Sequence, residues 1–169
     1  MTLCGDSGSA TDVTFGRDVG STEAGDDNRI VFAQFPVYQA PESWRIAAQL
    51  GLGTIGSERV LRPGLSVGRG TKNRHGYGWQ AADLAFEFRP DLGSVHRKMD
   101  LTWGIARPKG RRWILQVQAG KQDADPFYAR LVPSLVQPVT NRIHAQFGVT
   151  YGLTGEDTFG AVSGLWLEF

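Results

Sequence analysis

The sequence predicts an all-β fold, an antiparallel meander closed into a small β-barrel of about 8–10 strands. Three observations support this fold. From residue 28 onward, runs of about 10 to 13 residues alternate with a period of two and are separated by clusters of turn-forming residues. Glycine is abundant, at 22 residues, and aromatic residues make up 11% of the chain. No long window shows the period of an amphipathic helix, and closure of the meander would remove its two unpaired edges.

The chain divides into two parts. Residues 1–28 are rich in Gly, Ser and acidic residues, with Arg17 as the only cation. Such a composition buries too little apolar surface to order a segment. We therefore expect a flexible acidic N-terminal segment, in which the small residues at 8–10 resemble those before a signal cleavage site and 13–19 is a candidate short strand. Residues 29–169 are expected to form the β-barrel domain.

Within this domain the alternation predicts about nine strands, or ten with the N-terminal one. They are expected at 29–39, 44–53, 61–68, 77–88, 99–106, 113–120, 127–139, 142–153 and 157–169. Residues 69–76 and 89–98 are expected to be loops, because charged residues and glycine interrupt the apolar pattern there. Two prolines in 127–139 predict a distorted strand or a short helix, since proline cannot donate a ladder hydrogen bond.

Each run has one apolar face and one face of small or polar residues. In 142–153, for example, Phe147 and Val149 alternate with Gln146 and Gly148. Alternation alone does not say which face points outward, because a soluble barrel encloses its apolar face whereas a membrane barrel presents it to lipid. Three features favour lipid: glycine-rich polar faces, charges concentrated in turns, and aromatic residues near strand ends. Most turns are short, whereas membrane barrels usually carry longer loops on one side.

In the lipid-facing orientation, a set of charged and polar residues is expected to form a polar network in the lumen. This set is Arg45, Arg62, Asp83, Glu87, Asp100, Gln116, Gln118, Arg130, His144 and Gln146. Opposite charges in a narrow, partly dry interior must pair, because an unpaired buried ion is costly. A barrel of this size has little free interior once its side chains are placed. We therefore expect a packed polar plug and not a wide pore.

The final run, 157–169, carries the most specific pattern. Counting back in twos from Phe169 gives apolar or small residues, while Trp166 falls in the other set. The pattern resembles the last strand of Gram-negative outer-membrane β-barrels, which ends on a Phe behind alternating apolar residues. The family usually has a second aromatic residue where this chain has Leu167. The resemblance implies that Leu165, Leu167 and Phe169 form a membrane-assembly signal.

The same resemblance implies partners and a location. The partners would be outer-membrane lipid and the barrel-assembly machinery, in the outer membrane of a Gram-negative bacterium. The alternative location is that of a soluble protein in the periplasm or cytoplasm. Two basic stretches, 69–74 and 107–112, could contact lipid phosphates or be solvated turns. No nucleic-acid partner is expected, because the formal net charge is only +1.

No catalytic site, metal site or cofactor is predicted. His75 and His96 fall in expected loops, and no histidines or cysteines have the spacing of metal ligands. Small outer-membrane lipid hydrolases use a His–Ser pair near the C-terminus, but two residues after His144 stands Gln146. Cys4 is the one cysteine, so it cannot form an internal disulfide.

The sequence therefore predicts an architecture more closely than an activity. The leading hypothesis is a small outer-membrane β-barrel protein with a structural, adhesive or narrow-channel role. The alternative is a soluble β-barrel that binds a small apolar ligand inside. A second alternative is a membrane-embedded lipid-modifying enzyme, and an enzyme is the less favoured class because no nucleophile and base stand together.

Overall fold

The computed structural model describes residues 14–21, 27–39, 44–73, 76–122, 125–140, 142–155 and 159–167. Ten strands in these residues form a single sheet, in which each strand pairs antiparallel with the next one along the chain. The predicted all-β class and antiparallel meander are thereby confirmed. No helix in this part of the chain is long and apolar enough to cross a membrane.

The elements follow the expected order. They are β1 (Thr14–Ser21), β2 (Asp27–Gln39), β3 (Trp44–Ile55), β4 (Glu58–Asn73), β5 (Gly76–Arg89), β6 (Ser94–Ala106), the short 3-10 turn η1 (Pro108–Gly110), β7 (Arg112–Lys121), β8 (Tyr128–Pro138), β9 (Ile143–Thr154) and β10 (Phe159–Leu167). Because side chains alternate along every strand, each element contributes to both faces of the sheet.

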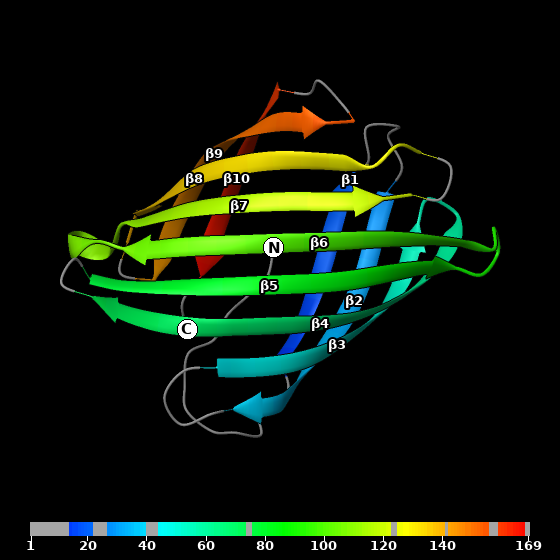
Figure 1. Cartoon of the computed structure of the whole chain (residues 1–169), viewed down its shortest axis with the longest axis horizontal. Helices are drawn as coiled ribbons and strands as arrows, with labels where there is room; N and C mark the ends of the chain where they lie inside the picture. Colours follow the sequence, from blue (N-terminus) through cyan, green and yellow to red (C-terminus); the bar gives the residue numbers. More distant parts are fainter. Residues whose placement is uncertain are drawn as a thin grey trace.

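The sheet curls strongly, so that β1, β2 and β10 lie behind β5, β6 and β7 (Figure 1). Strand twist makes a long meander bend round in this way. The β2–β3 pairing also shifts register between Pro36 and Tyr38, a bulge that bends the strand further. Among the described residues β1 and β10 do not pair with each other, so hydrogen bonds do not close the curled sheet there.

The first strand lies inside the segment that was expected to be flexible. β1 pairs with β2 over its whole length, from Thr14 opposite Gln34 to Ser21 opposite Asp27. The sheet therefore begins ahead of residue 29, the expected start of the barrel domain. The period-two pattern at 13–19 is the sequence signal of this strand.

Two expected loops are largely strand. β4 continues to Asn73, through much of the stretch 69–76, and β6 begins at Ser94, inside the stretch 89–98. The expectation of loops is wrong because pairing with β5 continues β4 to Asn73 and begins β6 at Ser94, although both stretches contain few apolar residues. A strand whose inner face is charged still has a period of two, although its hydrophobic signal is weak.

The proline-containing stretch 127–139 is a strand, β8, and not a helix. Pro133 lies opposite Leu115 of β7. On the other side, the pairing of β8 with β9 passes from Leu131 to Ser134. The missing N–H of proline therefore falls in a gap of the ladder, where it removes little.

Candidate functional site: an apolar outer face and a polar inner face

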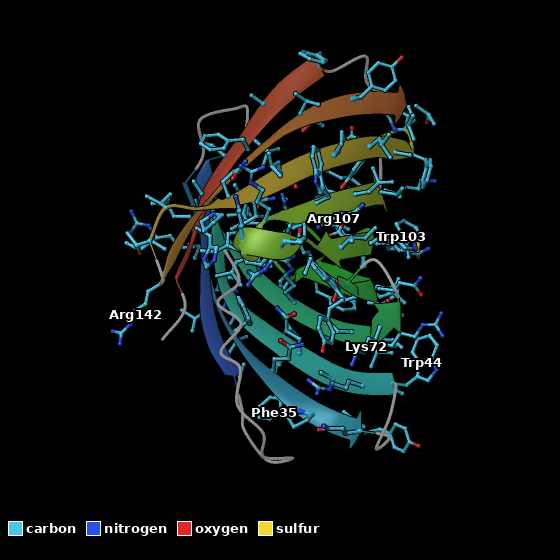
Figure 2. All side chains as sticks on the ribbon, turned by 90° about the vertical axis from the view of Figure 1, so that its left-hand side faces the viewer. Phe35, Trp44, Lys72, Trp103, Arg107 and Arg142 are labelled. Atoms are coloured by element: carbon cyan, nitrogen blue, oxygen red, sulfur yellow. The ribbon has the colours of Figure 1, made fainter. Side chains whose placement is uncertain are left out.

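The outer, convex face of the curled sheet carries exposed large apolar side chains, and Figure 2 shows Trp44 and Trp103 pointing away from the hollow side. Exposed on this face are Leu50, Leu52, Leu61, Leu65, Leu84, Phe86, Met99, Trp103, Ile105, Trp113, Leu115, Phe147, Val149, Tyr151 and Leu165. The register joins them into rows, such as Leu65, Leu84 and Met99 on three consecutive strands. The apolar surface is therefore continuous from strand to strand. Exposed patches of more than a few hundred Å² typically mark an interaction or membrane surface.

The inner, concave face carries the opposite residues. Its buried polar side chains include Glu87, His96, Ser134 and His144, of which Glu87 is only 1% exposed. Each of them stands in the phase that alternates with the outer apolar set. Soluble proteins normally bury apolar residues and expose charged ones, so the polarity of this sheet is inverted.

Glu87 on β5 lies at the centre of a charged cluster. Lys98 Nζ donates a hydrogen bond of 2.8 Å to Glu87 Oε1. Arg62 Nε lies 3.7 Å from the same oxygen, and His96 Nδ1 lies 3.9 Å from Oε2. β4 provides Arg62, while β6 provides His96 and Lys98. A carboxylate this deeply buried requires opposite charge close by, and strands on both sides provide it.

Two further carboxylates lie along the same strands. Asp83 and Asp100 are direct cross-strand partners, an arrangement that is repulsive when both are charged. The hydroxyl of Ser66 donates a hydrogen bond of 2.5 Å to Asp83. Arg130 interacts electrostatically with Asp100 and donates a hydrogen bond of 2.7 Å from Nε to Gln118 Oε1. The pair is thus held by a hydroxyl donor and a nearby cation.

Over this cluster the charges balance. The carboxylates are Asp83, Glu87 and Asp100, and the cations that act on Asp100 are Arg62, Lys98 and Arg130. Because each carboxylate has a cationic or hydroxyl neighbour, the cluster forms an internal network with little net charge.

A second polar chain runs across the inner faces of β8, β9 and β10. Trp166 Nε1 donates a hydrogen bond of 2.7 Å to Gln146 Oε1, and Gln146 Nε2 donates one of 2.9 Å to Ser134 Oγ. The guanidinium of Arg112 lies 5.5 Å from the centre of the Trp166 ring, within cation–π range. Trp166 stands directly opposite His144. The inner position of Trp166 explains why it is out of phase with the apolar residues of its strand.

Glycines on the inner face make room for aromatic rings. A Cβ at Gly104 would lie 2.1 Å from the indole of Trp79, and one at Gly120 would lie 2.6 Å from the hydroxyl of Tyr128. Each ring therefore occupies the space beside a glycine of the neighbouring strand that a Cβ would need. This packing fills space that larger side chains would otherwise compete for.

Parts of the inner face are apolar, and on β7 and β8 Ile114, Val132 and Val136 are buried there. Ile30, Ile55 and Val60 form a buried cluster on β2, β3 and β4. The predicted lumen set did not include this cluster, because the faces of 29–39 cannot be separated by their apolar content alone. It adds a small hydrophobic core beside the charged cluster.

The predicted lumen residues all fall on the inner face. Six of them belong to the charged cluster: Arg62, Asp83, Glu87, Asp100, Gln118 and Arg130. Gln146 is a member of the second polar chain, and His144 lies beside it. Gln116 donates a hydrogen bond of 3.2 Å to Thr102, and Arg45 is exposed at the start of β3. Sequence reasoning missed His96, Lys98, Ser66 and Trp166 as members of these groups. Counting back in twos from Asp100 reaches Lys98 and His96, so the phase of the strand was the available signal.

The assembly residues expected at the chain end are placed only in part. Leu165 is exposed on the outer face, Leu167 is the last residue of β10, and Phe169 lies outside the described residues, as do His75 and Cys4. In the described part of the chain, no group of three or more His, Cys, Asp or Glu side chains could hold a metal ion.

Two shallow depressions lie along β2 to β4. The first, of about 280 Å³, is lined by Val31, Phe32, Ala33, Phe35, Leu50 and Leu52. The second, of about 260 Å³, lies beside it at the rim, next to Arg59 and Pro90. Neither collects the polar groups that a catalytic or small-molecule site requires.

Comparisons with protein families, with characterised proteins and with solved structures find no match to this chain. Its function must therefore be inferred from the two faces and the two ends of its own sheet.

Proposed function

We propose that this chain is a small outer-membrane β-barrel protein with a structural, adhesive or narrow-channel role. The observation that carries the proposal is the inverted polarity of the sheet. The outer face exposes continuous rows of Leu, Phe, Met and Trp, while the inner face buries Glu87, His96 and His144.

The physical reason is the solvent that each face requires. Apolar surface is unfavourable in water by about 25 cal/mol per Å², so the outer rows favour a hydrocarbon surrounding. In hydrocarbon every backbone polar group must be satisfied within the protein, which a closed sheet achieves. Closure of β1 against β10 is part of the proposal.

The packed inner face favours a structural or adhesive role, or at most a narrow channel. Aromatic rings cover Gly104 and Gly120, and the charges of the Glu87 cluster are balanced internally. A wide aqueous pore would leave such charges hydrated and unpaired. The soluble-barrel alternative requires an apolar interior that can admit a ligand, whereas the inner face of this sheet buries Glu87, His96 and His144 beside its apolar residues.

The test is the requirement for detergent. We expect the purified chain to remain soluble and folded only in detergent or lipid, and to change its gel mobility when heated. A monomer that stays folded in detergent-free buffer and keeps one mobility would refute the membrane proposal and support the soluble alternative.

Single-cysteine labelling tests the orientation. In a Cys4→Ser background, Phe147→Cys should react with a lipid-soluble probe and be protected from a charged aqueous one. The matched control is the neighbouring inner position, Gln146→Cys, which should not react with the lipid-soluble probe. Aqueous labelling of position 147 with protection from the lipid probe would contradict the proposed orientation.

A further inference from the structure

We propose that one end of the barrel is a docking surface for the anionic headgroups of a phospholipid leaflet. This end, called the basic end, holds the β2–β3, β4–β5, β6–β7 and β8–β9 turns, on the left of Figure 1. The opposite end holds the β3–β4, β5–β6, β7–β8 and β9–β10 turns. The inference rests on the proposed membrane barrel and adds which end of it contacts anionic headgroups.

The charges of the two ends differ. The basic end carries Arg45, Arg69, Lys72, Arg107, Lys109, Arg111, Arg112 and Arg142. The carboxylates whose side chains the structure describes are Glu58, Asp83, Glu87, Asp91, Asp100 and Asp125, and register and turns place none of them at the basic end. Glu42 and Glu168 are outside the described side chains. Among the described side chains, cations therefore gather at the basic end without carboxylates beside them, although the formal net charge of the whole chain is only +1.

The opposite end is mixed. Asp91 pairs there with Arg59 at 2.6 Å, and Glu58 and Asp125 lie at the same end as Arg97 and Lys121. Carboxylates and cations therefore both occur among the described side chains of this end. Among the described side chains, those of the basic end alone carry charge of one sign, which attracts anions and repels cations.

Tryptophan is distributed in the same way. All five tryptophans lie in the half of the sheet next to the basic end, at positions 44, 79, 103, 113 and 166. Trp44, Trp103 and Trp113 are exposed on the outer face. Tryptophan favours the headgroup level of a bilayer because its ring is apolar and its N–H is polar. The apolar wall therefore changes to an interfacial belt near this end.

The cations are placed to reach phosphate from this belt. The guanidinium of Arg69 lies 5.0 Å from the centre of the Trp44 ring, its direct cross-strand partner. In the β6–β7 turn the backbone closes through the Arg107 N–H and the Arg111 carbonyl at 2.7 Å, and Arg107, Lys109 and Arg111 are all exposed. Figure 2 shows Trp44, Lys72, Trp103 and Arg107 from this end. In a leaflet the phosphates lie outside the hydrocarbon. The exposed cations likewise lie toward the tip of this end, beyond the tryptophans of the apolar wall, so that each group meets the layer it favours.

The tryptophans provide a probe of this end. The protein is inserted into phosphatidylcholine vesicles that contain about 30% phosphatidylglycerol, and one lipid or the other is brominated to quench nearby tryptophan fluorescence. We expect phosphatidylglycerol to be enriched around the tryptophans about fivefold, since one cation near an anionic surface contributes about that factor. High salt should reduce the enrichment.

Two double variants with the same loss of charge complete the test. Arg107→Gln with Arg111→Gln should lower the enrichment, while Arg97→Gln with Lys121→Gln at the opposite end should leave it unchanged. Equal quenching by both brominated lipids, in protein that keeps its heat-dependent gel mobility, would overturn this inference and leave the membrane barrel standing. An equal loss in both double variants would also overturn it, because the effect would then be one of total charge.

A chain that does not insert would contradict the proposed function itself. In that case sedimentation with preformed phosphatidylglycerol vesicles tests the surface directly. Binding that the Arg107/Arg111 variant loses and the Arg97/Lys121 variant keeps would support the anionic docking surface, whereas no sedimentation would overturn it.

Discussion

The outer and inner faces of the sheet are built by the same strands and by neighbouring residues, yet they have opposite surroundings. On β5, Phe86 is 40% exposed while Glu87, the next residue, is 1% exposed. On β9, Phe147 is exposed and His144 is buried. A sheet in water would reverse both assignments. The comparison teaches that alternation identifies the two faces, while the direction in which the sheet curls determines which of them is enclosed.

The largest effect should come from removing the charge at the centre of the inner face. Glu87→Gln leaves Lys98, Arg62 and His96 around a neutral side chain. Removing one partner of a buried charge pair typically destabilises by about 3–5 kcal/mol, and we expect about 3 kcal/mol because Lys98 is partly exposed. The measurement is the urea unfolding midpoint in detergent.

Two controls sharpen this prediction. Asp125→Asn, at an exposed position in the β7–β8 loop, should be nearly neutral. Adding Lys98→Gln to Glu87→Gln should recover part of the loss, because the uncompensated positive charge becomes smaller. If Glu87→Gln behaves like Asp125→Asn, the cluster contributes nothing to stability.

The second effect tests the outer face. Leu84→Lys places a charge near the middle of the apolar wall, where lysine or arginine facing lipid destabilises a membrane barrel by about 2–4 kcal/mol. The same change at Leu153, at the end of β9, should cost about 0–1 kcal/mol. Folding free energies in lipid vesicles should show this dependence on depth. If both substitutions leave the folding free energy nearly unchanged, the outer face contacts water and not lipid.

A smaller effect concerns the second polar chain. Trp166→Phe removes the indole N–H that donates to Gln146 and should destabilise by about 1 kcal/mol. Trp113→Phe is the matched control, because Trp113 is on the exposed outer face. Thermal unfolding in detergent should separate the two variants. A larger loss for Trp113→Phe would show that the inner hydrogen bond matters less than the outer ring.

The smallest effect should appear at the rim, in the pair of Arg59 and Asp91. Hydrogen bonds from the Arg59 guanidinium and backbone N–H hold the pKa of Asp91 below its usual range. Because the folded-state pKa is lowered, the pair contributes stability above the unfolded pKa and loses it as pH falls through the folded one. Full exposure keeps the contribution small.

The measurement is thermal stability of the wild type and Asp91→Asn between neutral and acidic pH. The two proteins should differ slightly at neutral pH and converge in acid, and salt should reduce the difference. A difference that grows toward acid would contradict the sign of this linkage.

Much of this structure was accessible from residue patterns. Period-two alternation predicted the all-β class and the meander, and it grouped the ten polar residues from Arg45 to Gln146 in the phase opposite to the apolar set. The apolar set led by Phe147 and Val149 was recognised as a single face. These features follow from local geometry, because a strand sends successive side chains to opposite sides whatever surrounds it.

Other features depended on contacts between strands. His96 and Lys98 were expected in a loop, and only the pairing of β5 with β6 brings them to Glu87. Trp166 is out of phase with the apolar residues of its strand, and only the pairing of β10 with β9 shows the reason, because it brings Gln146 within hydrogen-bonding distance of the indole N–H. Charged residues give a strand no hydrophobic signal, so their place in a sheet becomes visible only when their partners are known.

The sequence by itself therefore determined the strands, their order and the composition of each face, because these depend on neighbours along the chain. The tertiary structure decided which face is buried, which charges meet and how glycine and aromatic residues fill the hollow side. It also brought cations from separate turns to one end, although the formal net charge of the whole chain is only +1. Such groupings depend on register and curl, which join residues distant in sequence and which no local pattern specifies.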